Sequence, residues 1–509
     1  MNDALPILHV ARATIEAKGP LSIAGDLADP EVDAAVERDA NGLPAIPGTS
    51  LAGSLRHLRE LEFKGDPEDK YRRLFGWTAD DIRDIGPEEA KRAATTYQAS
   101  RLHITWAHIH DADNLPVDGL VTRQERLRDD PILGPMLDPV PARRDHVALD
   151  VRGVATKRQK FDRSYVPPGY RFTFELRLWS DDVRAGEEWA EIKRLLASPF
   201  WRLGGATRRG YGKIAVIRLA EECFDLTKAK SYRRFLRHQT RLDTPSPALR
   251  DGDRDWGADA TDGEATLELV PDTFIRFGQG DKLLGEHDRR DAERSVDMLV
   301  VTMPQVNWSG DRAALESHRH LLVPASAIKG AIAHRCRFHL LAAADRFADA
   351  LPDEASPKDR ERLAGEVDHL HEAVFGSAND DQDGKPTGRA GRLYLDDQLI
   401  PLGDAAKKLT LQAHNSIDRF SGGVRKKVLF SEELLFRPTL EVPIRIDPPS
   451  GLTDTQRQRL QACLGRSLAD LCQGRLALGA GGSKGHGYCT GEVKAAGATA
   501  RAWLQGGAP

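Results

Sequence analysis

The stretch LGGATRRGYGK, residues Leu203–Lys213, recurs near the C-terminus as LGAGGSKGHGY, residues Leu478–Tyr488. Both copies combine glycines with Arg or Lys and with an aromatic or imidazole ring. Glycine lets backbone N–H groups approach a ligand closely, and loops of this kind form anion-binding concavities. Neither copy has the spacing of a Walker loop or of the dinucleotide fingerprint, and one such loop alone is better interpreted as a tight turn. Two matching loops, with Gly210 and Gly485 at 485 − 210 = 275 residues apart, indicate a duplicated domain.

The composition is typical of a globular protein of several domains. The chain has 509 residues, 40% of them hydrophobic and 29% charged, which predicts roughly two to four domains. No apolar run is long enough to span a bilayer, and the N-terminus carries acid where a signal peptide carries base, so we expect no membrane partner. The five cysteines form no C-x-x-C pair, which favours a reducing, cytoplasmic location over a zinc ribbon or a disulfide framework.

The net charge of −4 is weak evidence against a nucleic-acid binder, because the charge is unevenly distributed. Residues 152–163 hold five cations against one acid, and residues 419–427 hold four cations and no acid. Electrostatic footprints are local, so both stretches are candidate phosphate contacts. We expect Arg158 and Arg425 to bind phosphate, although a solvated charged face explains each one nearly as well.

The first half predicts alternating strands and helices. After a strand at 7–16 and an acid-rich loop, IPGTSLAGSLR (Ile46–Arg56) opens a helix with leucines at helical spacing. Thr49 or Ser50 is the expected N-cap, and the helix N-terminus is a candidate phosphate site. Residues 111–144, rich in Pro, Asp and Arg, are expected to leave the domain body. The other expected elements are strands at 100–108 and 171–178, the second half-buried by its alternation, a helix at 187–196 and a strand from 214.

The second half repeats this order. Pro324 corresponds to Pro47 (324 − 47 = 277), Phe375-Gly376 to Phe75-Gly76, and residues 392–396 to residues 101–105. A strand with Pro443 at its centre is expected at a sheet edge, because proline cannot donate to the ladder. Recurrence in one order predicts two homologous domains, 1–225 and 263–495, with a linker at 226–262 and a tail at 496–509.

The helix start PGTSLAG, the later Phe-Gly and the closing glycine loop resemble the RAMP superfamily of CRISPR-associated proteins, over residues 5–220 and 265–495. HNSIDRFSGGV (His414–Val424) is similar to an H-N-x-I-D-R-x-T-G segment of backbone subunits of type III effector complexes, and HVALD (His146–Asp150) is a weaker version of it. The resemblance implies an α+β chain of two tandem ferredoxin-like domains, related to RNA-recognition motifs. Two units in one chain look most like the fused subunits of the III-D branch.

The resemblance also implies a role and a catalytic residue. Such subunits polymerise along a guide RNA (crRNA) beside other CRISPR effector subunits, and cleave complementary target RNA with Mg²⁺ or Mn²⁺. The aspartate needed for cleavage matches Asp33, 47 − 33 = 14 residues before Pro47, which we expect to hold the metal. Asp297, in SVDMLVV, is the second-half candidate. Without the resemblance, Asp33 would be interpreted as one of six solvated acids in a loop.

The expected RNA contacts lie at the two helix starts, the two glycine loops and the basic segments. The first helix has Ala52 where the family often has Lys, and the second has Ala325 where the motif has Gly. By position, residues 111–144 correspond to a thumb-like hairpin that splays guide–target base pairs in the family. The expected contacts are Ser50, Arg56, Arg158, Arg208, Arg209, Ser326, Lys329, Arg419, Arg425, Lys484 and His486.

Two other interpretations stay open. The chain could be a guide-binding scaffold without catalysis, or a guide-processing endonuclease that uses His486 as a general base without metal. Tyr211 holds the equivalent place in the first loop, which favours a guide contact for His486. His103, His108 and His110 lie close together, but on an alternating strand the first faces away from the other two, so a three-ligand zinc site is not expected.

Overall fold

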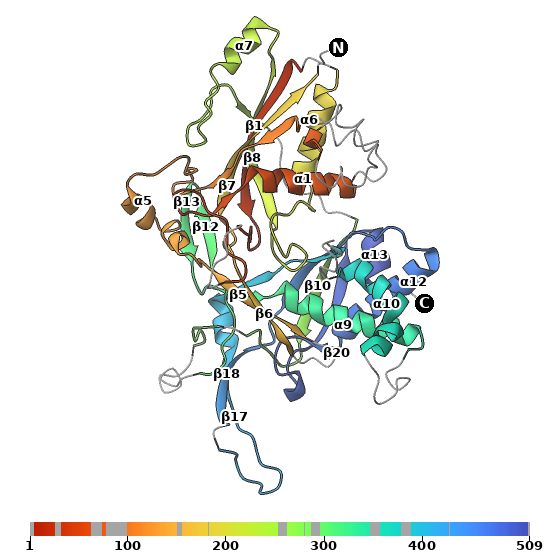
Figure 1. The fold of residues 1–509 in the computed structure, drawn as a ribbon. Coiled ribbons are helices and arrows are strands. Elements are labelled where there is room, and N and C mark those ends of the chain that lie inside the picture. The colour runs from red at the N-terminus through yellow and green to blue at the C-terminus, as the bar shows by residue number, and fades with distance from the viewer. Residues whose placement is uncertain are drawn as a thin grey trace.

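Two units of the same topology follow one another along the chain, and Figure 1 shows them one above the other with the N-terminus at the upper end. The computed structural model describes residues 5–25, 32–62, 74–77, 99–149, 155–181, 183–252, 262–278, 280–286, 296–346, 357–377, 388–426 and 428–506. No helix within these ranges is long and apolar enough to cross a membrane.

The first unit is built on an antiparallel sheet. Its elements are β1 (Ile7–Ala17), β2 (Ala45–Ile46), α1 (Gly48–Glu62), β3 (Leu102–Ile104), β4 (Ala107–Ile109), β7 (Arg171–Ser180), α6 (Ala185–Leu196) and β8 (Ile214–Asp225). β1 lies at the centre between β7 and β8, and β3 and β4 pair with the outer edge of β7. Taken as the strands of a βαββαβ unit, the sheet order is fourth, first, third, second. That order is the ferredoxin-like fold.

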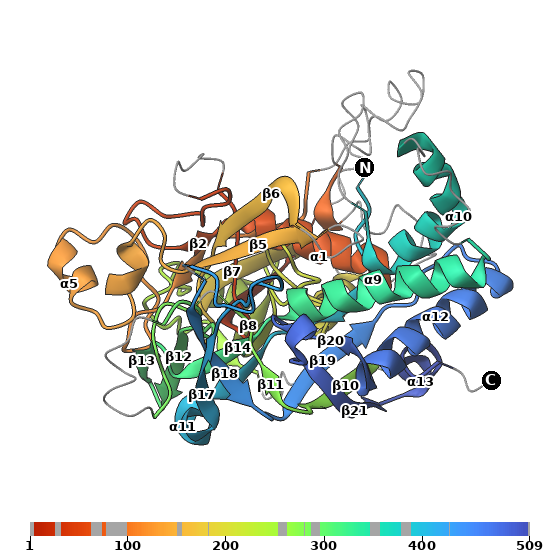
Figure 2. The same ribbon diagram turned by 90° about the horizontal axis from the view of Figure 1, so that it is seen from below.

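The second unit repeats the same order. Its elements are β10 (Glu264–Pro271), α9 (Ala325–Ala343), β15 (Leu393–Leu395), β19 (Leu440–Ile446), α12 (Asp454–Cys472), β20 (Gln473–Ala477) and β21 (Tyr488–Ala495). β10 is central, between β19 and β21, and β15 pairs with the outer edge of β19. Figure 2 shows α9 and α12 side by side along this unit. The fold class predicted from the sequence, two tandem ferredoxin-like α+β domains, is confirmed.

The helices form because their apolar residues recur on one face. In α9, Ile328, Ile332, Cys336 and Leu340 stand four residues apart, and all are fully buried in the second core. In α1, Leu51, Leu55 and Leu58 are buried in the same way against the first sheet. Burying one such side chain stabilises a fold by about 1.5–3 kcal/mol.

Residues 226–252, predicted to belong to a linker, fold onto the first unit. They form α7 (Ala229–Phe235) and β9 (Arg250–Asp251), which adds to the sheet beside β8. Arg12 of β1 donates to the carbonyls of Gln239 and Thr244, at 2.8 and 2.7 Å. This second layer buries both faces of β7, so that even Glu175 is 1% exposed. The expected half-buried strand is therefore buried over most of its length, with Arg171, Arg177 and Trp179 partly exposed.

Residues 111–144, expected to leave the domain body, pack against it. They form α5 (Gln124–Arg128) and η1 (Gly134–Leu137), and Ile132 is buried in the first core. The Asp130 carboxylate accepts hydrogen bonds from the amides of Ala112 and Ile132, at 3.0 and 2.9 Å. A Pro- and Asp-rich segment can thus be ordered, because its own carboxylates satisfy backbone donors. Within this segment the structure shows helical turns and no β-hairpin, up to Arg143, where β5 begins.

The projecting elements are two β-hairpins, each inserted between the second and third strands of its unit. They are β5 (Arg143–Leu149) with β6 (Ala155–Ser164), and β17 (Leu409–His414) with β18 (Phe430–Phe436). His146 stands opposite Phe161 in the first hairpin, and His414 stands opposite Phe430 in the second. This common register supports the predicted correspondence between the two segments. The β17–β18 hairpin forms the lowest part of the molecule in Figure 1.

A hairpin of the second unit clasps the first. It consists of β12 (Gln305–Ser309) and β13 (Arg312–Glu316). Trp308 Nε1 donates to the carbonyl of Gly169 at 2.7 Å, and the guanidinium of Arg171 lies 3.9 Å from the centre of the Trp308 ring. Val306 is buried in the core of the first unit. The two units are thus held together by packing as well as by chain connectivity.

The remaining elements complete the second unit. Residues 496–509, expected to be a tail, include a helix whose Trp503 and Leu504 are buried in the second core. The elements of the second unit not yet named are β11 (Phe274–Ile275), β14 (His320–Val323), α10 (Pro357–Phe375), β16 (Gln398–Pro401), α11 (Leu402–Ala405), η3 (Ala406–Lys408), η4 (Gly482–Lys484) and the C-terminal helix α13 (Ala498–Leu504).

Candidate nucleic-acid interface

The two glycine loops have the same backbone conformation. Gly205 N–H donates to the carbonyl of Ser22 at 2.8 Å, and Ala480 N–H donates to the carbonyl of Arg276 at 2.9 Å. These bonds tie each loop to the chain that follows the first strand of its unit. Four positions in each loop have positive φ, always 275 residues apart (479 − 204 = 275): Gly204, Ala206, Gly210 and Gly212, and Gly479, Gly481, Gly485 and Gly487.

Close backbone packing explains the glycines. A Cβ at Gly204 would clash with the carbonyl oxygen of Ser22, and one at Gly479 would clash with that of Arg276. Four amides of the first loop donate to protein carbonyls: those of Leu203, Gly205, Arg209 and Gly212. These amides are therefore not available to bind an anion. The loops are tight turns, and their cationic side chains, rather than these amides, remain for a ligand.

The base of each hairpin lies against the glycine loop of its unit. The His146 ring stacks on Phe161 with centroids 5.2 Å apart, and its Nε2 lies 3.2 Å from the hydroxyl of Tyr211. Burial, together with the neighbouring arginines, lowers the pKa of His146 to about 4, so that this ring is neutral at pH 7. In the second unit, His414 stacks on Phe430 at 5.0 Å.

The first hairpin base carries two cations that lack a carboxylate partner among the described residues. Arg163 Nη1 lies 3.5 Å from the Ser22 hydroxyl and covers Gly205, and Arg209 is exposed on the loop. Burial lowers the pKa of Arg163; Tyr211 opposes that shift, and the charge of Arg209 adds to it. The partly desolvated guanidinium of Arg163 therefore experiences repulsion from the charge of Arg209.

The second hairpin base carries an acid instead. Glu432 is 1% exposed and forms ion pairs with Arg276 and Lys484, at 3.0 and 2.9 Å, and His414 Nε2 lies 2.7 Å from its Oε1. Burial alone would raise the pKa of Glu432, but hydrogen bonds from Lys484 and Arg276 outweigh it and lower that pKa. Lys484, one of the expected RNA contacts, is thus engaged within the protein.

The two candidate catalytic carboxylates occupy equivalent places. Asp33 Oδ2 accepts the N–H of Asp162 at 3.0 Å, and Asp297 Oδ2 accepts the N–H of Ser431 at 2.8 Å. Asp162 and Ser431 each follow the phenylalanine that stands opposite the hairpin histidine. Both carboxylates are exposed. The correspondence proposed from two short sequence stretches is thus also a correspondence in space.

The surroundings of Asp33 fit a metal that is shared with a substrate. Within the described ranges, no group of three His, Cys, Asp or Glu side chains could hold a metal alone. Mg²⁺ is commonly bound through one or two carboxylates, with phosphate oxygens and water completing the octahedron. Asp33 is exposed, and the Asp162 carboxylate beside it pairs with Arg143 at 2.8 Å. Asp297 has Ser431 there instead, so its donor set is poorer.

Two expected contacts are taken up where the units meet. Arg208 Nε donates to the carbonyl of Gly391 at 3.2 Å. Lys329 is 7% exposed, and its ammonium donates to the carbonyls of Arg208 and Leu393, at 3.2 and 2.7 Å. Burial, with nearby arginines, lowers the pKa of Lys329 to about 7. Neither side chain presents a free cation to RNA.

The helix starts differ from the expected capping. α1 begins at Gly48 and α9 at Ala325, so Ser50 and Ser326 lie in the first turn rather than at the N-cap. In both helices a proline precedes the first residue, and in α9 the carboxylate of Asp397, distant in sequence, accepts the N–H of Ala325 at 2.8 Å. Arg56, within α1, pairs with Glu60 at 3.4 Å.

The other expected contacts divide by exposure. Arg209, Arg419 and Arg425 are exposed. His486 is buried in the second loop beside Phe274, which leaves its ring little access to a substrate. The side chain of Arg158, on β6, lies outside the described residues.

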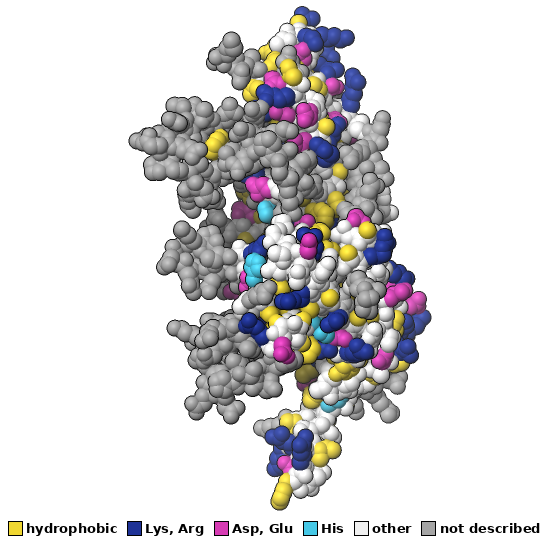
Figure 3. Space-filling model, turned by 90° about the vertical axis from the view of Figure 1, so that its right-hand side faces the viewer, with side chains coloured by type: hydrophobic (Ala, Val, Ile, Leu, Met, Phe, Trp, Pro, Cys, Tyr) yellow, Lys and Arg dark blue, Asp and Glu magenta, His cyan; other side chains and the backbone are white. Residues whose placement is uncertain are grey.

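The tip of the β17–β18 hairpin joins cations to apolar side chains. Phe420 is 101% exposed, and Ile417, Val424 and Leu429 are exposed near it. The turn is held by Asp418, whose carboxylate accepts the amides of Phe420 and Ser421. Figure 3 shows Lys/Arg and hydrophobic side chains together on this lowest projection. Sequence reasoning selected Arg419 and missed Phe420, although an aromatic residue within a basic turn was a usable signal.

Of the histidines near Trp106, His110 is engaged inside the first unit. His110 is buried, with Nε2 2.7 Å from the Thr173 hydroxyl and Nδ1 3.0 Å from Asn114 Oδ1. It therefore satisfies its hydrogen bonds inside the first unit, as a structural residue does.

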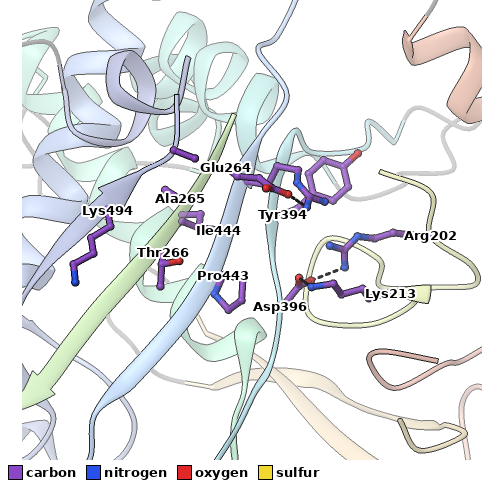
Figure 4. Close-up of a pocket in the computed structure, with 12 residues that line it drawn as sticks. Arg202, Lys213, Glu264, Ala265, Thr266, Tyr394, Asp396, Pro443, Ile444 and Lys494 are labelled. Atoms are coloured by element: carbon purple, nitrogen blue, oxygen red, sulfur yellow. Dashed lines mark hydrogen bonds and ion pairs between the residues drawn. The ribbon is translucent and has the colours of Figure 1, made fainter. Parts of the chain in front are cut away.

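The first glycine loop also docks the first unit on the second. Arg202 and Lys213, at its ends, form ion pairs with one carboxylate, Asp396, at 2.6 and 2.7 Å (Figure 4). These groups line a pocket of about 340 Å³ against the second sheet. Each cation that lines it pairs with an acid, since Arg445 binds Glu264 and Lys494 binds Glu268. The pocket is therefore a charged joint rather than a ligand site.

A second carboxylate completes this joint. Asp397 accepts the N–H of Ala325, at the start of α9, at 2.8 Å. Its other oxygen pairs with Arg144 at 2.8 Å, and both side chains are buried. Arg144 also lies 4.9 Å from the centre of the Tyr211 ring. The docked face of the first loop is thus continuous with the base of the first hairpin.

Comparison with known proteins gives one family. A family model described as RAMP superfamily matches residues 14–215 and 310–490. The two matched segments fall on the two units of the fold. No curated protein matches the chain.

Proposed function

The chain belongs to the RAMP superfamily as a tandem member, which indicates a CRISPR-associated RNA-binding subunit, and from that premise we propose a finer role. It is a guide-RNA-binding backbone subunit of a type III CRISPR-Cas interference complex, in the fused form of the III-D branch. With other effector subunits, it cleaves target RNA complementary to the guide. Its place of action is the cytoplasm.

The observation that carries this proposal is the pair of equivalent carboxylates, Asp33 and Asp297. Each is exposed at the base of a projecting hairpin, where its unit also gathers cations. RNA that passes over both units would meet one carboxylate in each. A repeated arrangement of this kind favours a repeated reaction over a solvated loop acid.

RNA contact would be mainly to the backbone, because a guide complex leaves sequence reading to base pairing. Arg209, Arg419 and Arg425 are exposed cations suited to phosphates. Phe420, at the hairpin tip, offers an aromatic face on which an unpaired base can stack. The hairpins, rather than residues 111–144, are the parts able to separate bases of a duplex.

In the cleavage step, the Asp33 carboxylate would hold the divalent metal, Mg²⁺ or Mn²⁺. Such a metal supplies charge stabilisation to the transition state at phosphorus. The backbone amide of Asp162 fixes one oxygen of Asp33, and because Asp33 is exposed, its other oxygen would be available to a ligand. Asp33 could also orient the attacking 2′-hydroxyl.

Two alternatives make different predictions. A scaffold without catalysis is favoured by the lack of a three-residue metal group among the described residues. A metal-independent endonuclease would need His486 as base, and the burial of that ring disfavours it. Cleavage that persists in a chelator would support the endonuclease, and binding without cleavage would support the scaffold.

The test uses the complex reconstituted with guide RNA and labelled complementary target RNA, in Mg²⁺ or Mn²⁺. Wild type is compared with Asp33→Ala, Asp297→Ala and the double variant, with Asp454→Ala as a control at an exposed acid on α12, outside both hairpins. We expect each single variant to lose one product band while target binding stays intact. Unchanged cleavage in the double variant would place catalysis in another subunit.

A further inference from the structure

Five equivalent positions surround each hairpin base, and the units carry opposite charges at one of them. Arg163 stands two residues after Phe161, and Glu432 stands two residues after Phe430, so the register makes them counterparts. The first unit has Ser22, His146, Arg163, Arg209 and Tyr211 at these positions, and the second has Arg276, His414, Glu432, Lys484 and His486.

We infer that the first unit holds a phosphodiester of the bound RNA between Arg163 and Arg209, and that in the second unit the Glu432 carboxylate occupies the place of that phosphate. The inference rests on the proposed RNA-binding function and adds an asymmetry to it. The first glycine loop binds RNA backbone, and the cation of the second loop is neutralised by Glu432 of its own unit.

The first-unit site is positively charged, and its two arginines have no carboxylate partner among the described residues. Arg163 covers Gly205, and its closest polar partner is the Ser22 hydroxyl at 3.5 Å, the outer limit of a hydrogen bond. Its Nε is buried without a partner among the described residues. A partly desolvated cation beside a second like charge is costly unless an anion joins them. A phosphate oxygen, which guanidinium binds in a bidentate manner, would satisfy both arginines.

The acids near this site do not compete for it. Side chains of a strand alternate between its faces, so Asp162 points away from the face that carries Arg163. Asp162 pairs with Arg143, and Asp145 pairs with Lys160, both on that other face of the hairpin. On the face toward the glycine loop, Arg144 stands opposite Arg163 and is paired with Asp397, which lies against Gly210. Arg163 and Arg209 are therefore the cations of that face that lack a carboxylate partner among the described residues.

The second-unit site is complete without RNA. Arg276 and Lys484 each contact a Glu432 oxygen at 3.0 Å or closer, and His414 adds a third contact. RNA could use these cations only by displacing a buried carboxylate. Lys484 should therefore contribute much less to binding than Arg209, although the two hold equivalent loop positions.

The experiment compares these counterparts in the full chain. Binding of a fluorescein-labelled single-stranded oligoribonucleotide is followed by anisotropy at several salt concentrations. We expect Arg163→Gln and Arg209→Gln each to weaken binding roughly tenfold, as the loss of one charge-assisted hydrogen bond does. Each should also reduce the slope of log K against log salt by about 0.7. Lys484→Gln should change the affinity by less than about twofold and leave the salt slope as in wild type.

Two charge exchanges sharpen the comparison. Arg163→Glu copies the second unit and should weaken binding more than Arg163→Gln, because the new carboxylate would pair with Arg209. Glu432→Gln should strengthen binding and steepen the salt dependence, because it releases Arg276 and Lys484. If Glu432→Gln proves unstable in a thermal melt, the comparison of Arg209→Gln with Lys484→Gln still decides.

Equal losses from Arg209→Gln and Lys484→Gln would overturn the asymmetry and leave RNA binding intact. Wild-type chain that binds no RNA would overturn the proposed function itself. Inorganic phosphate that displaces RNA from wild type at low millimolar concentration, but has no such effect on Arg163→Glu, would reassign the site to a free anion.

Discussion

The buried ion pair between Arg144 and Asp397 should be the largest single polar contribution to the joint between the units. Both side chains are within 5% exposure, so Asp397→Asn would leave a buried guanidinium without its counter-ion. Removing one partner of a buried pair costs about 3–5 kcal/mol. The amide oxygen of asparagine can still accept the N–H of Ala325, so the loss measures the ion pair and not the start of α9.

Urea unfolding of the full chain, followed by tryptophan fluorescence, measures this cost. Lys407→Ala is the matched control, because its pair with Asp404 is exposed and should be worth at most about 0.5 kcal/mol. Adding Arg144→Met to Asp397→Asn should recover part of the loss, since no unpaired charge then remains. If Asp397→Asn costs no more than Lys407→Ala, the joint does not depend on this pair.

Three further outcomes are expected. Gly204→Ala should lower the free energy of unfolding by more than about 2 kcal/mol in a urea titration, because φ there is +79° and the Ser22 carbonyl blocks a Cβ. The control Gly186→Ala, in open space on α6, should be neutral or stabilising by up to about 1 kcal/mol. Burial lowers the pKa of His110 to about 4 against 6.5 unfolded, so wild type should lose roughly 3 kcal/mol more than His110→Gln as pH falls from 7 to below 4; equal pH profiles would contradict this. Phe420→Ala should leave the melting temperature unchanged and weaken oligoribonucleotide binding by about 1–3 kcal/mol, and intact binding would remove the stacking role.

The duplication of the domain could be predicted because a backbone with positive φ requires glycine at most positions, so that the conformation of the loop is visible in the sequence. Gly210 and Gly485 both have positive φ, which other residues rarely adopt, so the loop leaves the same trace in both halves. Pro443, in contrast, lies in an interior strand. β15 pairs with β19 only up to Ile444, so the missing N–H of the proline costs no ladder bond. Sequence alone does not tell how far a neighbouring strand extends.

The site could be predicted only in part, because burial depends on the other unit. Asp33 and Asp297 were found through resemblance, and they do occupy equivalent places. Lys329 looks like a free cation at a helix start, and nothing in its own segment indicates that the first glycine loop packs over it. Glu432 was missed because one acid on an alternating strand carries no signal until its partners, 156 residues before it at Arg276 and 52 residues after it at Lys484, are placed.

The clasp made by Trp308, together with the joint at Asp396 and Asp397, gives the molecule the character of a ruler. Separate subunits on an RNA can slide or be lost one at a time. Two carboxylates carried by one polypeptide with packed units would keep a constant spacing along a bound strand. If both cleave as proposed, the fragments released between them would have one length, independent of how many copies assemble.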